Sequence, residues 1–206
     1  MISDKEINEA EKNIKHYFKE CLLKKDSDHA KFVKFYINNA KMSFQLANFL
    51  QKLSSNKETR RIADFPEDFE CFLWVVVTSY YSMFYIANAA MAKLGLKVGE
   101  RIVHKITQDA LLVYFIKNKK LAKSFLEDYK QTKSEVLGLM NVNEEELLKD
   151  FQIKAKELIA TFGYQRNKRG EFQYDITKTA KEHVAQLSLD RAKSFIQEMI
   201  KIIEKP

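Results

Sequence analysis

One run of uncharged residues, Cys71 to Ala92, constrains the fold of this chain more than any other feature. A run of this length raises the possibility of a membrane-spanning helix, since about 20 apolar residues cross a bilayer. Its middle holds Tyr80, Tyr81 and Ser82, which are too polar for a lipid-exposed segment. A helix that is apolar on every side packs on several sides. The sequence therefore predicts no membrane span but a central core helix that ends at Gly95.

The composition of the rest of the chain and the spacing of its apolar residues also indicate helices. It contains 5 Gly and 2 Pro, whereas turn-rich β architectures require these residues at their turns. Apolar residues recur at steps of three and four in two segments. The first stripe is Val33, Ile37, Ala40, Phe44, Ala47 and Leu50, and the second is Leu189, Ala192, Ile196, Met199 and Ile203. We therefore predict an all-α fold, an antiparallel bundle of about six to seven helices around the apolar one.

The chain is expected to form a single domain over residues 1–206, because no repeat, low-complexity tract or linker divides it. The core of this domain is predicted over residues 66–204, and an N-terminal helical pair at residues 3–53 is added to it. Residues 54–65 break the helical periodicity between the two parts. We expect a loop with a turn of helix there.

Capping signals predict where the helices begin. Ser3 with Glu6 forms a capping box for a helix that runs to about residue 23. Ser27 or Asp28 is expected to cap the second helix, which runs to about residue 53. Pro66 suits the first position of the core helix. Further helices are predicted over residues 101–117, 121–140 and 143–162, and a capping box at Thr179 and Glu182 opens the last one.

Charge and cysteine usage narrow the classes of function. The formal charge of +7 favours polyanionic partners, although it is spread over a lysine-rich surface. Cys21 and Cys71 lie far apart and are expected to be reduced core thiols. The four histidines are scattered and no glycine-rich phosphate loop occurs, so we expect no metal and no cofactor. The N-terminal segment is charged from its fourth residue, which favours a cytoplasmic protein.

A basic segment, GYQRNKRGEFQYD at residues 163–175, contains two of the six arginines of the chain. If a helix continues through Arg169, then Arg166 and Arg169 lie one turn apart and can bind neighbouring phosphates. Tyr174 approaches them only if the chain bends, which Gly170 permits. The segment predicts a nucleic-acid-binding site at Arg166, Asn167, Lys168 and Arg169. The alternative is a solvated helix end at which cations complement the helix dipole.

Two stretches resemble the HEPN superfamily of small helical bundles. The first is YYSMFYIANAAMAKLG in the core helix, and the second is RGEFQYD followed by an amphipathic helix. The second is similar to the Arg-x-x-x-x-Tyr-Asp ending of the branch that lacks the usual histidine. Together these stretches cover roughly residues 69–204. The resemblance implies a bundle that forms a homodimer, with the basic motifs beside a shared cleft, and often a minimal nucleotidyltransferase as partner.

On this resemblance we expect an RNA- or nucleotide-binding protein of a toxin–antitoxin or defence type system. Two alternatives stay open, a metal-independent endoribonuclease and a structural adaptor with no role in nucleic-acid binding. In ribonuclease members a histidine follows the motif arginine, but here Glu171 stands at the shortest spacing and residues 168–175 contain no histidine. RNA cleavage without metal requires a base that titrates near neutrality.

Catalysis would then rest on Arg169, Tyr174, Arg166 and Glu171. Tyrosine and glutamate ordinarily titrate near pH 10 and near about 4.3, so neither suits a base at neutral pH. His104 or His183 could supply the missing group in space, although a lone helical histidine is more often structural. The resemblance also places Tyr174 where a nucleotidyltransferase can modify it. The alternative is that Tyr174 packs against the last helix and anchors the loop.

Overall fold

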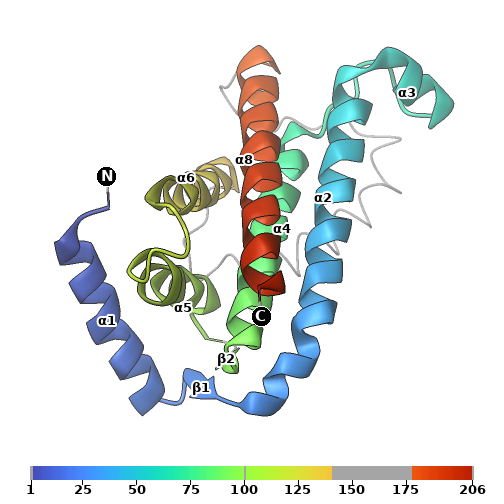
Figure 1. The fold of residues 1–206 in the computed structure, drawn as a ribbon. Helices are drawn as coiled ribbons and strands as arrows, with labels where there is room; N and C mark the ends of the chain where they lie inside the picture. The colour runs from blue at the N-terminus through green and yellow to red at the C-terminus, as the bar shows by residue number, and fades with distance from the viewer. Residues whose placement is uncertain (1, 100, 141–177, 206) are drawn as a thin grey trace.

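The structure of the chain is a computed structural model that describes residues 2–99, 101–140 and 178–205. These residues form a helical bundle with one short two-stranded ribbon (Figure 1). In order they are α1 (Asp4–Lys19), β1 (Leu23–Lys25), α2 (Val33–Ser55), α3 (Lys57–Ile62), α4 (Phe72–Lys93), β2 (Leu96–Val98), α5 (Val103–Ala110), α6 (Lys123–Met140) and α8 (Lys178–Glu204). A 3-10 turn precedes α2 and a π-helical turn, Leu111–Ile116, extends α5. The predicted all-α class is confirmed.

Helix α4 lies at the centre of the bundle. Figure 1 shows α8 in front of it and α2 alongside it, and both make extensive contacts with it. Every residue of α4 is buried apart from Leu73, Trp74, Tyr85 and Lys93. Among the residues that the structure describes, no helix is apolar over enough of its length to cross a membrane. The predicted central helix is therefore confirmed as a core element of a helical bundle.

Three polar side chains of α4 are accommodated in the core by hydrogen bonds to the backbone of the same helix. Thr78 Oγ1 lies 2.6 Å from the carbonyl oxygen of Trp74, and Ser82 Oγ lies 2.6 Å from that of Ser79. Asn88 Nδ2 donates to the carbonyl oxygen of Phe84 over 2.8 Å. Buried polar groups are costly unless they are hydrogen-bonded. These local bonds allow a helix of mixed composition to be surrounded by apolar neighbours.

Helix α2 packs against α4 through the apolar stripe that its periodicity predicts. Ala40 and Ala47 are fully buried at seven residues' separation, which places them two turns apart on one face. Val33, Ile37, Phe44 and Leu50 are partly buried against the same core. Because alanine has only a methyl side chain, α2 and α4 can approach each other closely at these positions.

The N-terminal part of the chain follows the prediction with two differences. Ser3 caps α1, because its Oγ accepts the amide hydrogen of Glu6 over 3.2 Å. Helix α1 nevertheless ends at Lys19, and Cys21, with φ of 56°, turns the chain into strand β1. Strand β1 pairs antiparallel with β2, a ribbon that the sequence did not predict. Asp26, and not Ser27 or Asp28, caps the 3-10 turn before α2.

The predicted start of the core helix at Pro66 is wrong, because α4 begins at Phe72. The chain turns at Asp64, whose φ is 58°, and runs back to the end of α2. There the amide of Cys71 donates to Ser54 Oγ over 2.9 Å. This contact fixes the start of α4 and buries the thiol of Cys71. The other cysteine, Cys21, is exposed, so the prediction of a core thiol is wrong for that residue.

The remaining predictions concern the later helices. The predicted helices at residues 101–117 and 121–140 correspond to α5 with its π-helical turn and to α6. In α8 the second stripe is buried as predicted, from Leu189 to Ile203. Lys178 and Thr179 are both helical, so Thr179 is not the N-cap of α8. The helix predicted at residues 143–162 lies outside the described residues.

The close approach of α2 and α4 predicts the effect of enlarging a buried alanine. Ala47→Leu should lower the free energy of unfolding by about 1–3 kcal/mol, because extra methyl groups must displace packed neighbours. Denaturant unfolding monitored by circular dichroism measures the change. Gln45→Leu is the matched control, since Gln45 is exposed on the same helix. Equal stability of the two variants would contradict the tight packing at Ala47.

Candidate functional site

The residues predicted to bind nucleic acid or to act in catalysis lie outside the described part of the chain. They are Arg166, Asn167, Lys168, Arg169, Glu171 and Tyr174. The nearest helices that the structure describes on either side of this segment in the sequence are α6, which ends at Met140, and α8 from Lys178 onward. We therefore describe the contacts between α6 and α8.

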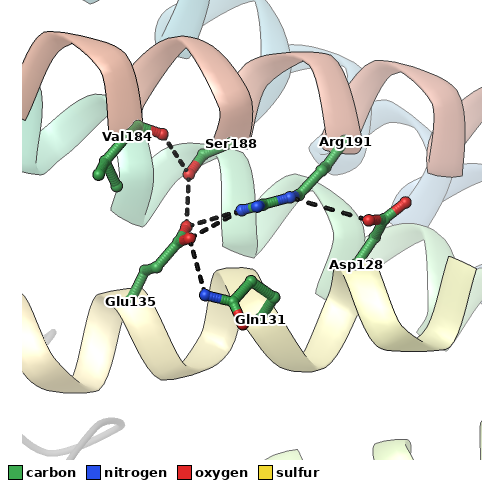
Figure 2. Close-up of polar contacts among 6 residues, drawn as sticks. All are labelled: Asp128, Gln131, Glu135, Val184, Ser188 and Arg191. Carbon is green, nitrogen blue, oxygen red and sulfur yellow. Dashed lines mark hydrogen bonds and ion pairs between the residues drawn. The ribbon is translucent and has the colours of Figure 1, made fainter. Parts of the chain in front are cut away.

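A polar network joins α6 to α8 (Figure 2). Arg191 of α8 donates from one terminal nitrogen to both carboxylate oxygens of Glu135 on α6, over 2.8 and 3.0 Å. Its Nε lies 3.8 Å from Oδ1 of Asp128. The side chains of Arg191 and Glu135 are 20% and 15% exposed, so water screens their attraction only partly. We call Asp128, Glu135, Ser188 and Arg191 the α6–α8 clamp.

Further hydrogen bonds hold the Glu135 carboxylate in place. Ser188 Oγ lies 3.0 Å from Glu135 Oε2 and 2.9 Å from the carbonyl oxygen of Val184. Gln131 Nε2 donates to Glu135 Oε1 over 3.1 Å (Figure 2). Burial raises the pKa of Asp128, and the Arg191 cation opposes that rise. A carboxylate that accepts several bonds beside a guanidinium is a strong link between two helices.

The spacing of these residues explains why the clamp forms. On α6, Asp128, Gln131 and Glu135 recur at steps of three and four, while on α8 Ser188 and Arg191 lie three residues apart. Each set therefore shares one helical face. These faces border the apolar faces by which α6 and α8 enter the core, so packing brings the polar sets together. The sequence analysis identified neither set.

A second polar cluster lies inside the bundle, where α4, α5 and α6 meet. The hydroxyl of Tyr80 is 2.8 Å from His104 Nδ1 and 3.3 Å from the hydroxyl of Tyr129. The ring of His104 is 4.6 Å from that of Phe84, centroid to centroid. Burial, helped by the charge of Lys133, lowers the pKa of His104 to about 3, so its imidazole is neutral.

The burial of His104 rules it out as the proton-transfer group for RNA cleavage. The residue is 1% exposed, and among the described residues its Nε2 has no hydrogen-bond partner. It acts as a core residue, as a lone helical histidine is expected to do, and it cannot reach a phosphodiester outside the bundle. His183 is exposed on the early part of α8. Of these two histidines, His183 is the one open to a ligand.

A third cluster attaches α1 to the bundle. Asp109 Oδ2 accepts from the hydroxyl of Tyr17 over 2.8 Å and from Asn13 Nδ2 over 3.0 Å. Burial raises the pKa of Asp109, while these two hydrogen bonds lower it. The role of this carboxylate is to connect α1 to α5. In the described ranges, no group of three or more His, Cys, Asp or Glu residues is placed to hold a metal ion.

Searches of family models, of curated proteins and of solved structures find no match to the chain. The candidate site is therefore argued from its residues and from the helices that flank it.

The α6–α8 clamp predicts that arginine and lysine are not interchangeable at position 191. Arg191→Lys should lower the free energy of unfolding by about 1–2 kcal/mol, because an ammonium cannot bridge Glu135 and Asp128 as a guanidinium does. Chemical denaturation measures the loss. Arg61→Lys is the control, since Arg61 pairs with Glu58 on the exposed surface of α3 and should change stability by less than about 0.5 kcal/mol. Equal losses of unfolding free energy in both variants would contradict the role of Arg191 in linking α6 to α8.

The buried imidazole of His104 predicts a pH dependence of stability. Its folded pKa lies below the unfolded value, so between about pH 3 and pH 6.5 the unfolded chain binds more protons. The contribution of His104 to stability is complete above about pH 6.5 and is lost as the pH falls toward 3. Relative to wild type, His104→Gln should therefore lose less stability on acidification. Unfolding free energies measured from pH 4 to pH 7 test this.

His16→Gln, which removes an exposed imidazole from α1, is the control for this comparison. A His104→Gln profile parallel to that of wild type would show that His104 does not titrate during acid unfolding.

Proposed function

We propose that this chain is a HEPN-like RNA- or nucleotide-binding protein of a toxin–antitoxin or defence type system. In this proposal Arg166, Asn167, Lys168 and Arg169 bind phosphate groups. The protein acts as a homodimer with a minimal nucleotidyltransferase as partner. The observation that carries the proposal is that two of the six arginines fall within four residues of a lysine-rich chain, and that the second of them, Arg169, opens an Arg-x-x-x-x-Tyr-Asp ending.

The use of arginine elsewhere in the chain supports this proposal. Arg60 is buried and donates to the carbonyl oxygens of Leu53 and Ser54 at the end of α2. Arg61 pairs with Glu58, and Arg191 belongs to the α6–α8 clamp. These three guanidinium groups already have partners within the protein, whereas Arg101 is exposed and stands apart from any second arginine. The planar fork of arginine suits phosphate better than the ammonium of lysine, so Arg166 and Arg169 are the natural candidates for a polyanion.

The α6–α8 clamp supports the proposal in a second way. Binding residues must be positioned by rigid elements, since a loosely held site loses affinity to conformational entropy. In the sequence, Arg166 and Arg169 fall between the end of α6 at Met140 and the start of α8 at Lys178. Glu135 lies five residues before the end of α6, and Ser188 lies ten residues into the described part of α8. The clamp thus fixes, relative to one another, the described helices that precede and follow the segment in the sequence.

One observation favours endoribonuclease activity as the second candidate. His183 is exposed on α8, eight residues after Asp175, and is close in sequence to the candidate phosphate-binding arginines. A histidine there could remove the proton of a 2′-hydroxyl while Arg166 and Arg169 stabilise the phosphorane. Binding without cleavage requires only the arginines. The distinction therefore depends on whether RNA is cut when divalent metal is absent.

The proposal predicts that Arg166→Ala with Arg169→Ala weakens RNA binding about 10-fold or more, since charge-assisted phosphate bonds are lost. The melting temperature should stay nearly unchanged if the arginines serve binding. Fluorescence anisotropy with a labelled RNA at two salt concentrations measures affinity, and the variant should show the shallower salt dependence.

The matched control removes the same charge elsewhere, through Arg61→Ala with Arg101→Ala, both at exposed positions. Equal weakening by the two double variants would mean that overall charge, and not the segment, determines binding. Unfolding of the Arg166→Ala, Arg169→Ala variant would mean that these arginines are structural. Incubating wild type and His183→Ala with RNA in excess chelator separates the two candidate functions, because only an endoribonuclease cuts and loses cutting with His183.

A further inference from the structure

Helix α2 has a second apolar face, directed away from the core. Phe35, Met42, Leu46 and Phe49 are 57%, 67%, 48% and 48% exposed. We call these four residues the outer seam. Monomeric proteins rarely leave large apolar side chains together in contact with water unless the surface binds a partner. The buried residues Ala40 and Ala47 lie on the opposite side of the same helix, so α2 is apolar on two faces.

The spacing of the outer seam is that of a helix-packing surface. Positions 35, 39, 42, 46 and 49 alternate steps of four and three, the heptad pattern by which one helix packs along another. Asn39 occupies the one polar position among the five, and its Nδ2 donates to the carbonyl oxygen of Phe35. A single asparagine within such a seam favours one register over others. The seam extends over about 21 Å at 1.5 Å per residue.

The charges beside the outer seam indicate the chemistry of its partner. Lys31, Lys34, Lys41 and Lys52 are exposed along this part of the chain. No aspartate or glutamate occurs from Lys31 to Ser55. A second copy of the chain would place one lysine-rich helix beside another, and like charges across an interface are costly. Nucleic acid would bind the lysines but does not call for Met42 and Leu46 at heptad spacing. A helix with acidic residues beside an apolar stripe satisfies both the spacing and the charge.

We propose that the outer seam is a docking site for an amphipathic helix of another protein, whose apolar stripe packs on Phe35, Met42, Leu46 and Phe49. In this complex, acidic side chains on the edges of the partner helix pair with the lysines of α2. The apolar contact supplies the affinity, and the charged edges supply orientation and selectivity. The outer seam and the segment proposed to bind RNA are different stretches of the sequence and are tested by different variants, so either proposal can fail without the other.

The test uses the full chain and a synthetic helix of about four heptads, with leucine at the seam positions and glutamate on the edges. A second peptide has lysine in place of each glutamate. Isothermal titration calorimetry should show binding of the glutamate peptide, and binding of the lysine peptide at least about 10-fold weaker. Met42→Glu should abolish binding of the glutamate peptide, because it places a charge in the middle of the seam.

Lys41→Glu should weaken binding of the glutamate peptide about 3- to 10-fold, and its matched control is Lys15→Glu on the exposed side of α1. Leu94→Glu, at an exposed apolar residue after α4, should leave binding unchanged. Equal binding of the two peptides, or full binding by Met42→Glu, would overturn the proposal.

Other occupants give different results, and each would replace the proposed partner. Light scattering of a dimer that Met42→Glu dissociates would assign the seam to a second copy. Sedimentation with anionic vesicles, lost in Met42→Glu while neither peptide binds, would assign it to a membrane surface. Failure of the wild-type chain to bind either peptide would show that the seam does not accept a helix of another protein, which would overturn the proposal.

Discussion

The enclosure of α4 is the constraint on which the rest of the structure depends. A helix that is apolar on nearly every side is stable in water only when other helices cover it, and α2, α6 and α8 do so. Thr78, Ser82 and Asn88 bond to the backbone of α4 itself, and the hydroxyl of Tyr80 meets partners on α5 and α6. Most of the surface that α2, α6 and α8 present to α4 is therefore an apolar stripe on one side of each helix. Their other faces are free to vary, which is where the α6–α8 clamp and the outer seam are found.

The fold could be predicted largely from periodicity, because the buried face of a helix places an apolar residue at every third or fourth position of the sequence. The stripe from Val33 to Leu50 and the stripe from Leu189 to Ile203 both lie against the core. The errors lie where a boundary is set by a distant residue. Proline is common at the first position of a helix, which is why Pro66 was predicted there. The hydrogen bond from the amide of Cys71 to Ser54 Oγ instead places the start of α4 after Cys71. The strand Leu23–Lys25 was missed because three residues carry no periodic signal and the partner strand lies far along the chain.

Only one part of the candidate site, the basic segment at residues 163–175, could be predicted from the sequence. The basic segment is visible in the sequence because arginine is scarce elsewhere, and this needs no knowledge of contacts. The α6–α8 clamp is not visible in that way. Arg191 and Glu135 are each ordinary residues of a charged helix, and only the packing of α6 on α8 brings them within 2.8 Å. The buried position of His104 likewise follows from tertiary packing, although a lone helical histidine was expected to be structural more often than functional.

The ribbon of β1 and β2 has a consequence for the order in which the chain folds. Leu23 pairs with Val98, so the ribbon closes a loop that contains α2, α3 and α4. Closing a loop of unfolded chain costs more entropy as the loop lengthens, and three paired residues return little of it. Once α2 and α4 have packed antiparallel, however, the ends of that loop are already neighbours. The ribbon should therefore form after this helical hairpin, and α1 should be among the last elements to dock and the first to leave when the protein is stressed.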